Sequence, residues 1–96
     1  MTRLETTQGD LLEFDIHLFV DCEPRPLCEG EEMFFETDKD AYGRSISIRQ
    51  ANVHFEVPAV NLQPGRYPFR AGIIFSTGDR KTVFSPENSE LTVRRK

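Results

Sequence analysis

LQPGRY, at residues 62–67, is the most informative stretch of this 96-residue sequence for its architecture. In sandwiches of two β-sheets, a tyrosine just after a corner returns its hydroxyl to a backbone group a few residues upstream. Tyr67 has this place, and Leu62 is expected to fill the core from the preceding loop. Pro64 presets φ for the first turn position, and Gly65 supplies the positive φ that a type II turn requires at the second. We therefore predict a structural corner made of these four residues, with the Tyr67 hydroxyl bonded near Leu62 or Gln63.

Most of the remaining chain alternates apolar and polar residues with the period of two that is typical of half-buried strands. Turn residues separate these runs, and no convincing helical period is present. The pattern predicts an Ig-like Greek-key antiparallel β-sandwich of six to eight strands, folded as a single domain over residues 1–96. Residues 94–96 are expected to form a disordered basic tail. The predicted strands are residues 10–20, 33–37, 45–48, 53–57, 67–75, 82–84 and 91–93.

Composition and charge argue against several classes of partner. The net charge is −4 and the basic residues are scattered, whereas nucleic-acid binding needs clustered Lys and Arg. The longest apolar runs, such as residues 71–75, are far shorter than the roughly 20 residues of a membrane helix. The first ten residues also lack the apolar stretch of a secretory signal peptide. We therefore expect a soluble chain with no signal peptide, no nucleic-acid partner and no membrane association.

The charges are divided unevenly along the chain. Residues 1–40 hold twelve acidic and three basic residues, a net −9, whereas residues 41–96 hold four acidic and nine basic residues, a net +5. Opposite charges on the two halves should attract each other. The attraction either acts within one folded molecule or joins different copies head to tail, so a homo-oligomer remains one of the expected arrangements.

The two cysteines do not match a recognisable catalytic or metal-binding motif. Cys22 and Cys28 enclose the loop EPRPL, a spacing that fits neither CxxC redox chemistry nor a paired zinc knuckle. A local disulfide is an alternative, but in a chain without an export signal we favour free thiols.

Other polar residues give equally little sign of catalysis. His17 and His54 each lie on the polar face of a predicted strand with no recognisable acid or nucleophile beside them, so both are interpreted as surface histidines. The DxDxxG pattern at residues 38–43 resembles the start of a calcium loop, but Tyr42 stands at a ligand position and Arg49 replaces the final acid. We interpret it as a plain turn. No enzyme activity, catalytic residue, cofactor or metal is expected.

Two phenylalanines fall on the opposite strand face from their apolar neighbours. Phe19 precedes Val20, and Phe34 precedes Phe35, so each pair points to both faces of a strand. Either the sheet is covered on both faces there, or Phe19 and Phe34 form an exposed patch that contacts a partner.

Read from end to end, the order of motifs resembles short β-sandwich proteins of bacteriophages and prophages. The shared features are QGD at residues 8–10 before the strand LLEFDIHLFV, VHFEVP at residues 53–58, the hairpin LQPGRYPFRAGIIFSTGDRKTVF and the closing LTV. Related domains form the amino-terminal, Ig-like part of baseplate upper proteins in phages of Gram-positive bacteria. The loop CEPRPLC replaces a shorter linker of that pattern.

The resemblance implies a non-enzymatic structural or assembly protein of a phage or prophage tail or baseplate. Its partners would be other virion or tail proteins, and it would be found in the host cytoplasm during assembly and then in the virion. A carbohydrate- or protein-binding Ig-like module, acting as an adhesion or accessory domain, is the alternative.

Overall fold

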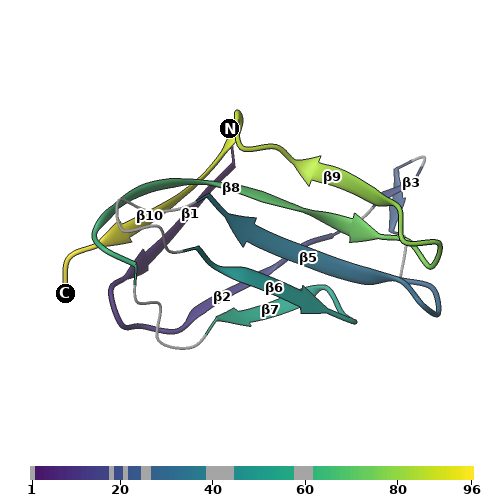
Figure 1. The fold of residues 1–96 in the computed structure, drawn as a ribbon, viewed down its shortest axis with the longest axis horizontal. Coiled ribbons are helices and arrows are strands. Elements are labelled where there is room, and N and C mark those ends of the chain that lie inside the picture. The colour runs from purple at the N-terminus through teal and green to yellow at the C-terminus, as the bar shows by residue number, and fades with distance from the viewer. Residues whose placement is uncertain (1, 18, 21, 25–26, 39–44, 58–61) are drawn as a thin grey trace.

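The computed structural model describes residues 2–17, 19–20, 22–24, 27–38, 45–57 and 62–96, and these residues form strands and connecting segments without a helix (Figure 1). The all-β prediction is thereby confirmed, and the strands lie in sandwich-like layers. Greek-key, Ig-like connectivity remains a prediction. The described residues contain no helix that is long and apolar enough to cross a membrane. The strands are β1 Thr2–Thr7, β2 Leu12–Asp15, β3 Phe19–Val20, β4 Glu23–Pro24, β5 Glu32–Thr37, β6 Ser47–Gln50, β7 His54–Val57, β8 Gly65–Ile74, β9 Arg80–Phe84 and β10 Ser89–Arg94.

The larger sheet has the strand order β1-β10-β8-β5-β6, with β9 also paired to β8. Its pairs are antiparallel apart from β1 and β10, which run parallel, with Thr2 opposite Ser89 and Thr7 opposite Arg94. The prediction of a purely antiparallel sandwich is wrong at this edge. A hairpin would force two strands to run in opposite directions, but β1 leads into β2 of the other layer and is free to pair in parallel.

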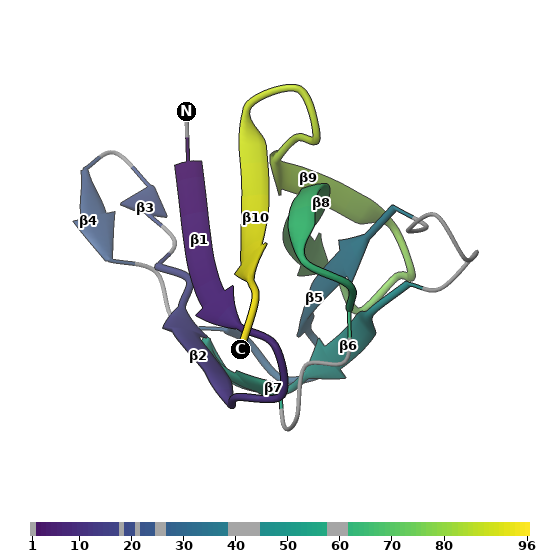
Figure 2. The same cartoon turned by 90° about the vertical axis from the view of Figure 1, so that its left-hand side faces the viewer.

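The second layer consists of β2 and β7, which lie on the far side of the core from β8 and β10 (Figure 2). Inward side chains of the two strands meet the larger sheet, and the rings of Phe14 and Phe55 stack with centroids 4.9 Å apart. Phe35 packs 4.9 Å from Phe14 and 5.2 Å from Phe69, so one aromatic cluster joins both layers. The buried core comprises Leu12, Ile16, Met33, Phe35, Phe55, Val57, Leu62, Tyr67, Phe69, Ala71, Ile73, Leu91 and Val93.

Strand boundaries differ from the predictions at both ends of the chain. The strand expected over residues 10–20 is divided into β2, which ends at Asp15, and β3 at Phe19–Val20, although the backbone N–H of Ile16 still donates to the carbonyl oxygen of Val53 at 2.8 Å. Strand β1 was not predicted at all. At the other end, Arg94 belongs to β10 and its guanidinium donates to Glu5 at 2.8 Å, so it is part of the fold and not of a disordered tail.

A β-bulge interrupts the pairing of β8 with β9. Ala71 lies opposite Phe84 whereas Gly72 lies opposite Thr82, which leaves Val83 as an extra residue in β9. Val83 is 43% exposed. The extra residue shifts the alternation, so Phe84 packs against the core with its ring centroid 6.4 Å from that of Phe69.

The predicted corner precedes β8. The Tyr67 hydroxyl donates a hydrogen bond to the carbonyl oxygen of Gln63, and the Leu62 side chain is buried in the core. Gly65 has a φ of +155°, which has the expected positive sign. This value differs from the roughly +80° of a type II turn, because Gly65 is already the first residue of the extended strand.

Candidate functional site

A cluster of ionisable side chains covers the outer face of the β2–β7 layer. Glu13 lies directly opposite Glu56, and Asp15 lies directly opposite His54. Alternation along each strand points these four side chains away from the core, because Leu12, Phe14, Phe55 and Val57 occupy the inward positions. Each of the four side chains is about half exposed. We call this group the His54 cluster.

The backbone pairing explains why the four side chains are so close. The bond from Ile16 N–H to Val53 O makes these two residues a hydrogen-bonded pair, and such pairs alternate with non-hydrogen-bonded pairs along an antiparallel ladder. The backbones of Asp15 and His54 are therefore not hydrogen-bonded to each other. In a pair of this kind the two Cα atoms are only about 4.5 Å apart. Facing side chains in such a pair reach each other readily.

Asp15 holds the imidazole of His54 in one orientation. The Nδ1 atom of His54 lies 2.6 Å from Oδ1 of Asp15, and the carboxylate can only accept, so Nδ1–H is the donor. This hydrogen bond raises the pKa of His54 above its ordinary value of 6.5, the Glu56 carboxylate raises it further, and desolvation acts in the opposite direction. The backbone N–H of His54 donates to Oδ1 of Asn52 at 3.0 Å, which also fixes the start of β7.

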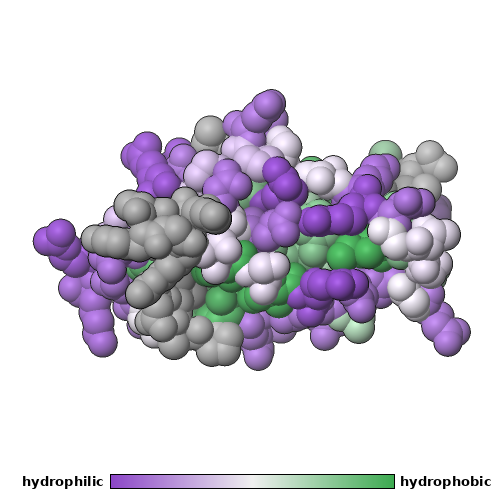
Figure 3. All heavy atoms as spheres, in the orientation of Figure 1, coloured by the Kyte–Doolittle hydropathy of each residue, from purple (hydrophilic) through white to green (hydrophobic). Residues whose placement is uncertain are grey.

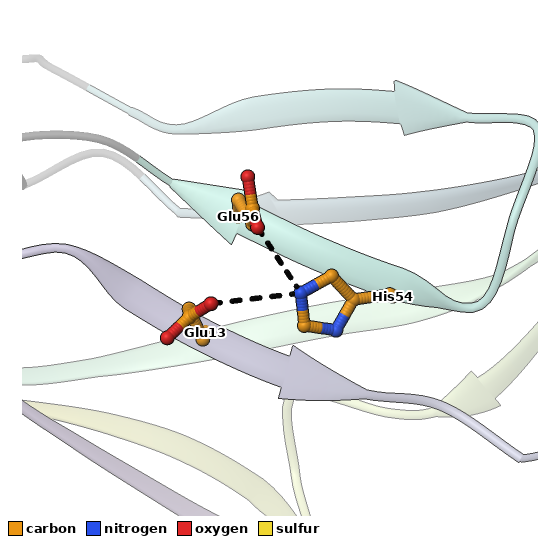
Figure 4. A group of neighbouring side chains, drawn as sticks. All are labelled: Glu13, His54 and Glu56. Atoms are coloured by element: carbon orange, nitrogen blue, oxygen red, sulfur yellow. Dashed lines mark ion pairs between the residues drawn. The ribbon is translucent and has the colours of Figure 1, made fainter.

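The other ring nitrogen points between two carboxylates, one from each strand (Figure 4). His54 Nε2 lies 3.7 Å from Oε1 of Glu13 and 3.4 Å from Oε1 of Glu56. The three potential ligand atoms lie within 4.8 Å of one another. Imidazole and carboxylates arranged in this way can bind a cation, or they can form ion pairs when the imidazole is protonated.

The sequence prediction that His54 has no recognisable acidic partner is wrong, because Asp15, which lies 39 residues earlier in the chain, meets it from the neighbouring strand. A signal was present in the sequence: acids alternate at positions 13 and 15, and His54 alternates with Glu56. Only the register of β2 against β7 shows that these positions meet. His17 is exposed, as expected of a surface histidine.

The side chain of Phe34 is buried. The interpretation of Phe34 as part of an exposed patch that contacts a partner is therefore wrong. The side chain is 2% exposed although it points to the outer face of the larger sheet. The guanidinium of Arg80 lies 4.1 Å from the centroid of the Phe34 ring, an arrangement that favours a cation–π contact. The sheet is therefore covered on both faces at this point, which was the other interpretation of the sequence.

A shallow pocket surrounds this phenylalanine. Its volume is about 440 Å³ and its lining residues are Phe34, Glu36, Ser47, Arg49, Ile74, Gly78 and Arg80. On the face seen in Figure 3, apolar atoms form a band through the region crossed by β5, with hydrophilic side chains above and below. Arg80 lies 2.8 Å from Glu36 and Arg49 lies 2.6 Å from Glu32, so both arginines of the pocket are already paired.

Several predicted features lie beyond the described part of the structure. The side chain of Phe19 and residues 39–43 of the calcium-like pattern are outside it. Cys22 and Cys28 are free and exposed.

The ion pairs show where the charge asymmetry of the sequence acts. Acids from the first forty residues pair with basic residues from the rest of the chain, which is the attraction within one molecule that the sequence left as one of two alternatives. These pairs are Glu5 with Arg94, Glu32 with Arg49, Glu36 with Arg70 and Arg80, and Glu13 and Asp15 with His54. Part of the asymmetry is thus neutralised within one molecule, and head-to-tail association through the other charged residues remains a prediction.

No protein-family model matches the chain, and no curated protein shows significant sequence similarity to it. The likeness to phage tail and baseplate domains thus remains a prediction from the sequence.

Proposed function

We propose that this chain is a non-enzymatic assembly protein that binds a partner through the open edge of β2. The proposed setting is the one that the sequence resemblance implies, a phage or prophage tail or baseplate, where its partners are other virion or tail proteins. The observation that carries the proposal is the incomplete second layer: among the described residues, β2 pairs with β7 and no strand pairs with its other edge.

The backbone of β2 is suitable for adding a strand. Since Asp15 and Glu13 belong to non-hydrogen-bonded pairs with β7, their N–H and C=O groups face the opposite edge. An extended segment of a partner can hydrogen-bond to such an edge, with side-chain contacts supplying specificity. Leu11, immediately before β2, is 48% exposed and offers an apolar contact beside the start of this strand.

The glycan-binding alternative has less support from the structure. Carbohydrate-binding sandwiches use exposed aromatic rings as platforms, but the large exposed apolar side chains among the described residues are Leu11 and Val83. The aromatic rings whose side chains are described are buried or partly buried.

The test compares capture of tail proteins by matched variants of the full chain. Wild-type protein is immobilised, exposed to a lysate of an induced lysogen, and its bound proteins are identified by mass spectrometry. Leu11→Lys places a charge beside the start of β2 and should abolish capture of a tail or baseplate component. Val83→Lys makes the same change at the other exposed apolar residue, on β9, and should retain it. Equal capture by both variants, or no tail component bound to wild type, contradicts the proposal.

Self-association through the same edge is measured separately by sedimentation of the purified chain at low and high salt. Association through backbone hydrogen bonds at the β2 edge should depend little on salt, whereas head-to-tail attraction between the acidic and basic halves should weaken as salt rises. A strict monomer in both buffers would exclude the homo-oligomer and leave docking to a different protein.

A further inference from the structure

We propose that Glu13, His54 and Glu56 form a binding site for a divalent transition-metal cation, with Asp15 as the residue that orients the histidine. This inference goes beyond the proposed assembly function, since it concerns the outer face of the β2–β7 layer and not its edge.

The separations of the ligand atoms fit a metal ion. In a tetrahedral zinc site with ligand distances of about 2.0 to 2.2 Å, two ligand atoms lie about 3.3 to 3.6 Å apart. Nε2 of His54 is 3.4 Å from Glu56 Oε1 and 3.7 Å from Glu13 Oε1, and all three ligand atoms lie within 4.8 Å of one another, so rotation of the half-exposed carboxylates can bring them to the distances of such a site. The view in Figure 4 shows the two carboxylates converging on this nitrogen from neighbouring strands.

The orientation of His54 is the one that a metal ligand requires. With the Nδ1 proton donated to Asp15, the lone pair of the neutral imidazole is on Nε2, on the side of the two glutamates. Metal-binding histidines commonly donate their other ring N–H to a carboxylate, which fixes the tautomer and increases ligand basicity. Asp15 is therefore a positioning residue and not itself a ligand in this proposal.

The strand pairing supplies an independent reason for a cation at this place. Glu13 and Glu56 are directly opposite each other on one face of the layer, and like charges in that position destabilise a pair of strands. A divalent ion between them replaces repulsion with two attractive contacts. The ladder also holds the backbone of all three ligands on adjacent strands, which limits the freedom lost on binding.

The donor set selects the class of cation. An imidazole nitrogen suits zinc, copper and nickel, whereas calcium and magnesium prefer oxygen ligands alone. Three protein ligands leave a coordination position for water or for a group from another molecule. The competing arrangement is a protonated His54 that forms ion pairs with all three carboxylates and leaves no place for a metal.

Zinc titration of the full chain with Cys22 and Cys28 replaced by serine tests the proposal without interference from the thiols. At about pH 7.5, where neutral imidazole is accessible, calorimetry should show stoichiometric zinc binding, and the NMR signals of the His54 ring should shift. His54→Ala should abolish binding, and Asp15→Asn should weaken it by about 10-fold to 100-fold. His17→Ala changes the other histidine of the chain and should bind zinc like the parent. Unchanged affinity in His54→Ala, or no shift of the His54 ring signals at saturating zinc, overturns the metal site and supports the protonated ion-pair cluster.

Discussion

Replacing Gly72 with alanine is expected to force β9 away from β8. A Cβ atom at this position would lie 2.1 Å from the carbonyl oxygen of Lys81 and 3.0 Å from Cα of Thr82. Both obstacles are backbone atoms, so a change of side-chain rotamer cannot remove the overlap. The close approach is a consequence of the bulge, which begins between Ala71 and Gly72.

The size of the effect follows from the overlap. Since Cβ atoms essentially never come within 3.0 Å of another heavy atom, the Lys81 oxygen must retreat by about 0.9 Å. Forced overpacking of this kind costs about 1 to 3 kcal/mol of unfolding free energy. For a domain of this size each kcal/mol lowers Tm by about 4 to 8 °C, so Gly72→Ala should lower Tm by about 4 to 24 °C.

The assay is thermal and urea denaturation followed by circular dichroism, with amide hydrogen exchange as a local measurement. Gly78→Ala is the matched control, because Gly78 has a φ of +93° but no atom within 4 Å of a new Cβ. Its cost of about 1 kcal/mol is conformational and leaves β9 protected from exchange. Gly72→Ala should expose the amides of β9. A Tm loss no larger than that of Gly78→Ala, with β9 still protected, would refute the predicted clash.

Tyr67→Phe leaves the carbonyl group at the corner without this hydroxyl donor and should cost about 1 to 3 kcal/mol in urea denaturation; an unchanged midpoint would count against the corner. In metal-free protein, NMR titration should find the pKa of His54 above 6.5, and Asp15→Asn should lower it. Because the folded-state pKa is raised, the contribution of His54 to stability is complete below about pH 6.5 and is lost as pH rises through the folded-state pKa. A His54 pKa unaffected by Asp15→Asn would contradict this assignment of its cause. Arg80→Ala should expose the Phe34 ring and increase binding of a hydrophobic dye, whereas Arg80→Lys should give a smaller increase; equal dye binding by wild type and Arg80→Ala would show that the guanidinium does not cover the ring.

Local patterns predicted the parts of the fold whose partners are close in sequence or whose inward face is strongly apolar. The corner is one example, since Leu62, Gln63 and Tyr67 are near neighbours. Strand β5 is another, because its run of Met and Phe is typical of strands and aromatic residues there fill the core.

The missed elements depend on distant pairing. Strand β1 carries mostly threonine and charged residues, and it is a strand because β10 lies beside it. Strict alternation would place Val83 and Phe84 on the wrong faces, because the bulge shifts the period of two by one residue.

The His54 cluster was missed for a related reason. Period-two alternation correctly places Glu13, Asp15, His54 and Glu56 on polar faces, but it does not give the register between the two strands. The environment of Phe34 also depends on tertiary structure, since Arg80 reaches its ring from β9.

The parallel pairing of β1 with β10 constrains the order of folding during synthesis. Thr2 pairs with Ser89 and Thr7 with Arg94, so the ladder of β1 cannot form until those late residues have left the ribosome. Contacts that are so distant in sequence also form slowly, because a long loop must close first. Until then β1 has an unpaired edge that the β10 of another copy can fill in the same register. Refolding at high concentration should therefore favour exchange of these terminal strands between molecules, giving domain-swapped dimers.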